Sequence, residues 1–249
     1  MSNTIAPDEI RQSVRDRYAD LARQSSSCCG PTGCDCNTNY PDQLANAVPD
    51  DITSFSLGCG DPITIAYLQP GETVVDLGSG GGLDCFLAAQ RVGPTGHVIG
   101  VDMTPEMLAK ARANAERVGA TNVEFREGFI EHLPVDSGAA DVVISNCVIN
   151  LSPDKPQVLR DIFRVLRSGG RVAISDIVTD GELPEATRAS MAEWSACVAG
   201  ALDVKEYVGG LQAAGFVEVK VQPRDQLENP LALIPAYEPF SAIITARKP

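Results

Sequence analysis

Apolar strands followed by amphipathic helices recur along most of the chain. An apolar run at 74–77 leads into a glycine-rich turn at 78–82, and apolar residues at helical spacing follow directly. Further strands are predicted at 97–101, 122–126, 140–145 and 171–177. This repeated strand–helix order predicts an α/β fold with a mainly parallel sheet between two layers of helices. Two final strands, near 216–221 and 240–246, predict an antiparallel hairpin that closes the sheet.

Capping residues mark where several helices begin. Asp61-Pro62 and Thr104-Pro105 each place a capping side chain before a proline at the first helical position. After residue 176 the pattern changes, and two helices are predicted at 184–199 and 204–214. We expect both helices to lie in an insertion around 180–215.

The first 60 residues differ from the rest of the chain. Ile10, Val14, Tyr18 and Leu21 fall on one face of a helix predicted from 8 to 24, which must cover another surface, as a lid would. The following segment is too rich in Ser, Gly and Pro for regular structure, and it carries Cys28, Cys29, Cys34 and Cys36. We therefore divide the chain into an N-terminal helix and cysteine-rich lid at 1–60 and a core domain at 61–249.

Composition restricts the partners and the compartment. The net charge of −13 makes a nucleic-acid partner improbable, because phosphate binding needs clustered Lys and Arg. No run approaches the ~18 apolar residues of a membrane span, and the N-terminus lacks a signal peptide's apolar core. We therefore expect a cytoplasmic chain with mostly reduced thiols and no membrane contact. Eight cysteines in such a chain indicate metal, metalloid or redox chemistry before structural disulfides.

The glycine-rich turn predicts a nucleotide-like ligand. The helix after it directs its first N–H groups toward whatever sits above the strand. The run at 97–101 ends in Asp102, whose carboxylate can accept from both hydroxyls of a ribose. Ligands in such sheets bind outside the carboxyl ends of the strands, so Asn146 converges on the same crevice and Ile130 and Glu131 could contact an adenine.

The amino-acid sequence of the turn distinguishes between classes of nucleotide ligand. Asp-Leu-Gly-Ser-Gly at 76–80 departs from the Gly-x-Gly-x-x-Gly of dinucleotide sites, which leaves NAD as the weaker alternative. It resembles the first motif of the S-adenosylmethionine (SAM) methyltransferases, in which the acid and the first glycines line the methionine part of the cofactor. The resemblance implies cofactor contacts from Asp76, Gly78, Ser79, Gly80, Asp102, Met103, Ile130, Glu131 and Asn146.

Three dispersed cysteines, Cys59, Cys147 and Cys197, are placed by the pattern near the same edge of the sheet. Thiolates are soft ligands, and a three-thiol site suits trivalent arsenic. The segments around them are Leu-Gly-Cys-Gly at 57–60, Asn-Cys-Val-Ile-Asn-Leu at 146–151 and Ala-Cys-Val-Ala-Gly-Ala-Leu at 196–202. Together with Gly-Val-Asp-Met-Thr at 100–104, they resemble the arsenite methyltransferases.

That resemblance implies a fold, an activity and partners. The fold is a Rossmann-like, seven-stranded class I SAM methyltransferase sheet with an N-terminal helical, cysteine-rich extension. The activity is methyl transfer from SAM to As(III), supplied as arsenite or its thiol conjugate, for arsenic detoxification. Cys147 and Cys197 would bind arsenic with Cys59 as a third thiol. One thiol of the N-terminal loop, such as Cys29, would pair with Cys59 in a redox step that needs an external thiol, glutathione or thioredoxin.

Other interpretations stay open at this point. The four loop cysteines could bind zinc, although they lack the usual spacing, and Cys85 should be a small core hydrophobe. The chain could methylate another small molecule, such as a quinone ring, or it could sequester arsenite without catalysis. Longer members of the family carry a further domain after this core, so steps attributed to that domain are expected to differ here.

Overall fold

The computed structural model describes residues 5–24, 40, 48–55, 58, 60–188, 190–191, 194, 197–224 and 239–249. The predictions for Cys28, Cys29, Cys34, Cys36 and Cys59 lie outside the described residues.

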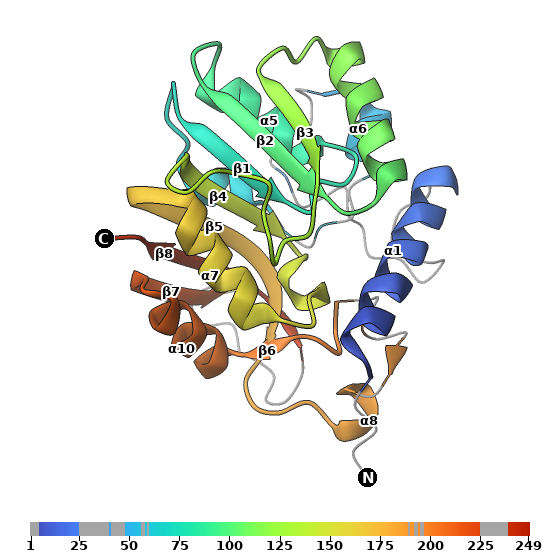
Figure 1. The fold of residues 1–249 in the computed structure, drawn as a ribbon, viewed down its shortest axis with the longest axis vertical. Coiled ribbons are helices and arrows are strands. Elements are labelled where there is room, and N and C mark those ends of the chain that lie inside the picture. The colour runs from blue at the N-terminus through green and yellow to red at the C-terminus, as the bar shows by residue number, and fades with distance from the viewer. Residues whose placement is uncertain are drawn as a thin grey trace.

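One mixed sheet forms the centre of the molecule, with the strand order β3-β2-β1-β4-β5-β8-β7 (Figure 1). The strands are β1 (Thr73–Leu77), β2 (His97–Asp102), β3 (Val123–Glu127), β4 (Ala140–Asn146), β5 (Leu166–Thr179), β6 (Leu202–Asp203), β7 (Val217–Pro223) and β8 (Phe240–Arg247). β1 to β5 pair in parallel, whereas β8 runs antiparallel to both β5 and β7. This confirms the predicted α/β sheet and its closing hairpin. A short eighth strand, β6, was not predicted and pairs with the end of β5.

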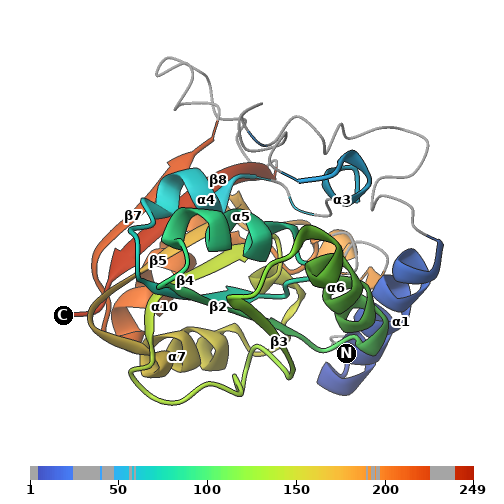
Figure 2. The ribbon, with the colours of Figure 1, turned by 90° about the horizontal axis from the view of Figure 1, so that it is seen from above.

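Helices cover both faces of this sheet (Figure 2). α4 (Pro62–Ala66), α5 (Leu83–Val92) and α6 (Pro105–Val118) share one apolar core with one face of β1 and β2. α7 (Lys155–Val165) and α10 (Val204–Ala214) share the other core with β4 and β5. The remaining helices are α1 (Pro7–Gln24), α3 (Asp50–Thr53), the 3₁₀ turn η2 (Ile149–Leu151) and α8 (Glu185–Arg188).

The predicted helix starts are confirmed, with one helix shorter than expected. Asp61 caps α4 by accepting from the backbone N–H of Thr64. Pro105 begins α6 with Thr104 at the N-cap position, but the Thr104 side chain makes no capping hydrogen bond. The helix predicted at 184–199 begins as α8, which ends at Arg188, and Met191 and Trp194 are again helical. Its last predicted turn contains Cys197 with a φ of 65°, a left-handed conformation that no α-helix accommodates.

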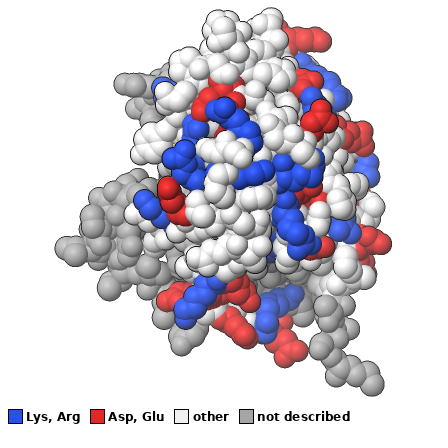
Figure 3. All heavy atoms as spheres, turned by 60° about the vertical axis from the view of Figure 1, so that its left-hand side comes forward, with Lys and Arg blue, Asp and Glu red and all other residues white. Residues whose placement is uncertain are grey.

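Charge is unevenly distributed over the surface. Figure 3 shows Lys and Arg side chains gathered over the middle of one face, with Asp and Glu beside them, although the whole chain carries −13. Ion pairs such as Arg171–Glu72, at 2.7 Å, tie β5 to the turn before β1. Within the part of the chain that the structure describes, no helix has both the length and the apolar character to cross a membrane.

Candidate active site

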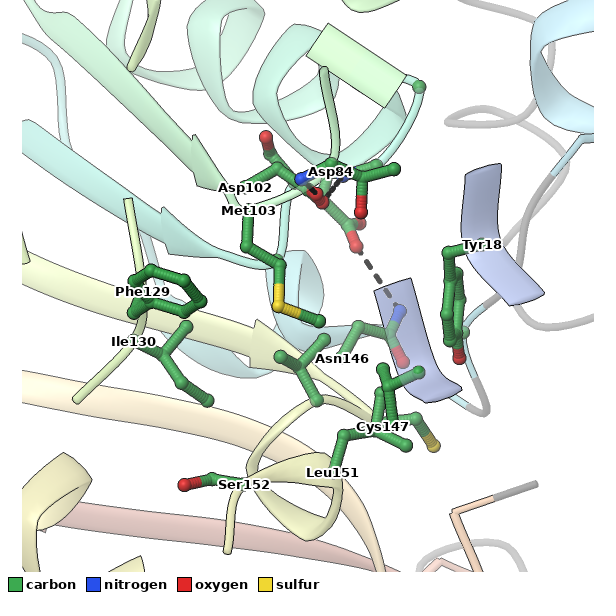
Figure 4. A pocket seen from close by; sticks show the side chains of 18 of the residues that line it. Tyr18, Asp84, Asp102, Met103, Phe129, Ile130, Asn146, Cys147, Leu151 and Ser152 are labelled. Carbon is green, nitrogen blue, oxygen red and sulfur yellow. Dashed lines mark hydrogen bonds between the residues drawn. The ribbon is translucent and has the colours of Figure 1, made fainter. Parts of the chain in front are cut away.

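A pocket opens at the carboxyl ends of β1, β2 and β4, and residues of α1 form part of its wall (Figure 4). It has about 1030 Å³ when its open mouth is counted, which is enough for a nucleoside with an attached side chain. Figure 4 shows Phe129, Ile130 and Met103 on one side of the cavity and Tyr18 and Cys147 on the other. One side is therefore apolar, and the opposite side carries a phenol and a sulfur.

Most of the residues that the sequence assigned to the ligand line this pocket. They are Gly78, Ser79, Gly80, Asp102, Met103, Ile130, Glu131, Asn146 and Cys147. Asp76 does not line it: its carboxylate is buried in β1 and accepts a hydrogen bond from Cys85 Sγ at 3.2 Å. Burial, with the nearby Asp84 charge, raises the pKa of Asp76 well above its ordinary value.

The glycine-rich turn is fixed to the end of β2. Gly78 and Gly80 have φ values of 64° and 51°, which L side chains rarely adopt, and a Cβ at Gly78 would lie 2.5 Å from the Val148 side chain. Asp102 accepts hydrogen bonds from the backbone N–H of Gly80 at 3.0 Å and of Thr104 at 2.8 Å. Burial raises the pKa of Asp102, while these two N–H donors oppose the rise. The carboxylate is thereby held at the pocket wall.

Asp84 is a pocket residue that sequence reasoning missed. It lies in the first turn of α5 and is buried, and its carboxylate accepts from Tyr40 Oη at 2.7 Å and from Asn146 Nδ2 at 3.2 Å (Figure 4). Burial raises the pKa of Asp84 to about 6, against the two hydrogen bonds that lower it. The available signal was its position two residues after the glycine turn, where a carboxylate faces the same ligand as the turn.

Asn146 connects Asp84 to the segment around residue 59. Its Nδ2 also donates to the Gly60 carbonyl at 2.8 Å, and its Oδ1 accepts from the Gly60 N–H at 3.2 Å. A Cβ at Gly58 would lie 2.3 Å from the Asn146 amide, and one at Gly60 would lie 1.8 Å from Ser175 Oγ. The two glycines on either side of position 59 are therefore required for this close approach.

Helix α1 closes one side of the pocket. Arg11 and Tyr18 line the cavity, and Ile10 and Val14 are buried. Arg11 is ion-paired with Glu131 at 3.4 Å, and Arg23 at the far end of α1 contacts Glu106 of α6. Glu131 also accepts from Ser152 Oγ at 2.7 Å, so its carboxylate helps to anchor α1.

Cys147 and Cys197 belong to one buried cluster under α1, together with Ile10, Val14 and Leu151. Cys197 Sγ donates to the Cys147 carbonyl at 3.0 Å and lies 3.9 Å from Tyr18 Oη. Both cysteines have positive φ, 59° at Cys147 and 65° at Cys197. Cys197 is in the reduced form, whereas Cys147 is disulfide-bonded.

The geometry of the pocket fits SAM. The glycine turn leaves room where a Cβ would collide with a neighbour, and Asp102 offers a carboxylate at the end of the next strand, where a ribose can bind. Phe129 and Ile130 provide an apolar surface for a flat ring. The buried Asp84 carboxylate provides a negative charge for a cationic group.

Comparison with known proteins places the chain in a family. A model of the methyltransferase domain matches residues 68–215. The arsenite methyltransferase of Halobacterium salinarum is 46% identical over 264 residues, which cover 98% of this chain and 68% of that protein. The human arsenite methyltransferase is 37% identical over 226 residues, covering 84% of this chain and 58% of its own length. The chain thus spans about two thirds or less of these two relatives.

A solved structure agrees with this result. The crystal structure of an arsenic (III) S-adenosylmethionine methyltransferase from Chlamydomonas reinhardtii is similar with a TM-score of 0.68 and 33% identity, covering 84% of this chain and 74% of that one. Fold, pocket and sequence therefore agree, and the chain belongs to the arsenite methyltransferase family of SAM-dependent enzymes.

Proposed function

We propose that this protein transfers methyl groups from SAM to trivalent arsenic held by the sulfurs of Cys147 and Cys197, with Cys59 as a third thiol. The observation that carries the proposal is the meeting of two cysteines, 50 residues apart in the chain, in one buried cluster from which Cys147 reaches the pocket wall. A soft As(III) centre prefers thiolates to the oxygen and nitrogen ligands that other side chains offer.

The pocket residues have separate roles in holding the cofactor. The turn at Gly78, Ser79 and Gly80 brings its main chain to the pocket wall, where the N–H of Ser79 is held by the Val101 carbonyl and that of Gly80 by Asp102. Asp102 also accepts from the ribose hydroxyls. Ile130 and Met103 cover the base, and the Asp84 carboxylate pairs with the cationic amino group. When bound, SAM supplies a methyl group on a positively charged sulfur.

The proposed reaction requires no general base. An oxygen or nitrogen nucleophile usually loses a proton during methylation, whereas the arsenic lone pair carries none, so positioning suffices. The chain has two histidines, and neither lines the pocket. Helix α1 closes over the thiols and keeps water from the reacting atoms.

A thiol reductant belongs to the proposal because of electron balance. When arsenic gives its lone pair to a methyl group, its formal oxidation state rises by two, and a second transfer needs two electrons. A pair of thiols that closes to a disulfide supplies them, and glutathione or thioredoxin restores the thiols by exchange. Cys29 and Cys59 are proposed for this pair. The disulfide form of Cys147 indicates that this cysteine must also be reduced before it binds arsenic.

Product analysis of single variants tests the proposal. Purified protein is incubated with SAM, glutathione and arsenite, and the arsenic species are separated by chromatography with mass detection. Cys147→Ser and Cys197→Ser should each abolish methylation while SAM affinity is retained, because a hard hydroxyl cannot replace a soft thiolate. Cys85→Ser is the matched control, since Cys85 is buried but bonded to Asp76 outside the pocket.

The two rival functions predict different results. A methyltransferase for a quinone-like substrate would retain its turnover in Cys147→Ser. A sequestering protein would bind arsenite without releasing S-adenosylhomocysteine. Full arsenic methylation by either serine variant would refute the assignment of that cysteine.

A further inference from the structure

Asn150 links the two segments that carry Cys147 and Cys197. Its side chain is completely buried, and its Nδ2 donates to the carbonyl of Ile177 at 2.6 Å and to the carbonyl of Cys197 at 3.3 Å. Ile177 lies near the end of β5, and Asn150 follows Cys147 by three residues. One amide group therefore holds the main chain of Cys197 against both η2 and the sheet.

A reciprocal contact runs in the opposite direction. Cys197 Sγ donates to the carbonyl of Cys147 at 3.0 Å, and the N–H of Cys147 donates to the carbonyl of Ser175 in β5 at 2.8 Å. Each cysteine segment thus touches the backbone of the other, and both are attached to β5. A shift of either segment would break a buried hydrogen bond.

Lys155 and Trp194 provide a second connection between the same segments. The Lys155 ammonium is buried, donates to the Ser152 carbonyl at 2.8 Å and lies 4.7 Å from the centre of the Trp194 ring. Gly200 completes this contact, because a Cβ there would lie 2.0 Å from the Asn150 carbonyl oxygen and 2.7 Å from the Trp194 ring. The main chain at Gly200 therefore lies directly against the main chain at Asn150.

We infer that Asn150 is a positioning residue for arsenic: its amide sets the separation of Cys147 and Cys197, and the Lys155–Trp194 contact is the second support. The inference rests on the proposed function, in which both sulfurs bind one arsenic. Two ligands of one centre must be held within a fraction of an ångström of their bonding positions. Both cysteines have left-handed backbones, which persist only where the surroundings hold them.

The test replaces Asn150 by a side chain of equal size that has no N–H donor. Asn150→Asp loses both N–H donors, so the carbonyls of Ile177 and Cys197 lose their partner. Asn122→Asp is the matched control, because Asn122 Nδ2 donates to the carbonyls of Ala89 and Gly93 far from the pocket. A phosphine reductant keeps the cysteines reduced without adding a sulfur ligand.

Arsenite affinity, SAM affinity and the number of sulfur neighbours of arsenic, from X-ray absorption, are measured for each protein. Asn150→Asp should bind arsenite at least tenfold more weakly and with one sulfur fewer than the wild type, while SAM affinity changes less than twofold. Asn122→Asp should melt at a lower temperature and keep the arsenite affinity and sulfur count of the wild type. A general loss of stability would not reduce the sulfur count in one variant alone.

Several results would overturn the inference. One is an unchanged sulfur count and arsenite affinity in Asn150→Asp, and another is an equal loss in Asn122→Asp. If Asn150→Asp does not fold, the variant Lys155→Met is measured in its place, because it removes the ammonium over the Trp194 ring. Arsenite binding that is severalfold weaker in Lys155→Met supports the inference, and unchanged arsenite binding refutes it. Failure of the wild type itself to bind arsenite would instead refute the proposed function, and the inference with it.

Discussion

Acidification should weaken SAM binding through the single carboxyl group of Asp84. This side chain lines the pocket, and burial raises its pKa to about 6. The ionised form is the one that attracts the cationic cofactor. Affinity should therefore be high above pH 6 and fall as the pH drops through the pKa of Asp84.

The size of the effect follows from that pKa. A carboxyl group with a pKa near 6 is about 97% ionised at pH 7.5 and about 9% ionised at pH 5. If only the ionised form binds, the dissociation constant rises about tenfold between these two pH values, which corresponds to about 1.4 kcal/mol. Asp84→Asn, which has no ionised form, should bind SAM at pH 7.5 more weakly than the wild type does at pH 5.

Titration calorimetry of SAM at pH 7.5, 6 and 5 measures this dependence. The wild type should show the tenfold change, and Asp84→Asn should show a nearly constant, weak affinity. Asp51→Asn serves as the control, because Asp51 is an exposed acid paired with Arg117 outside the pocket and should leave the dependence intact. The reasoning fails if the wild-type constant does not change with pH, or if Asp84→Asn keeps the full pH dependence.

Three further changes test other parts of the site. Asp102→Ala should weaken SAM binding by about 1.5 to 3 kcal/mol in calorimetry, because a charge-assisted contact to the ribose is lost; an unchanged constant would remove Asp102 from the cofactor site. Cys85→Ala should leave methylation intact but lower the free energy of unfolding in urea by about 1 to 3 kcal/mol, because the buried Asp76 carboxylate loses its donor. Loss of arsenic binding with unchanged stability would contradict that view. Arg11→Ala should speed hydrogen exchange in α1, because its partly exposed ion pair with Glu131 contributes about 0.2 to 1 kcal/mol; equal exchange would show that apolar packing alone holds the helix.

Local patterns were sufficient to predict the sheet and most helices. The apolar run that became β2 ends in Asp102 at the position where the pocket opens, and proline marked the start of α6. These signals act between neighbours in the chain, so periodicity and capping reveal them.

Contacts between distant residues could not be predicted. Asp84 owes its place at the pocket to Tyr40, 44 residues earlier, and to Asn146, 62 residues later. The segment at 184–199 has helix-forming composition, yet packing of Gly200 against the Asn150 carbonyl requires a turn near Cys197. Tertiary contacts override helix propensity there.

The left-handed backbone conformations of Cys147 and Cys197 should affect which substitutions arise at these positions in laboratory evolution. An L-residue in this conformation costs about 1 to 2 kcal/mol relative to the usual one, and glycine avoids most of that cost at the expense of about 0.5 to 1 kcal/mol of chain entropy. Glycine at either position should therefore relieve that backbone cost, offset in part by the loss of a buried sulfur from the cluster under α1, while leaving the protein inactive. A population selected for heat resistance without arsenic should lose these two thiols early, and arsenic in the medium should be what retains them.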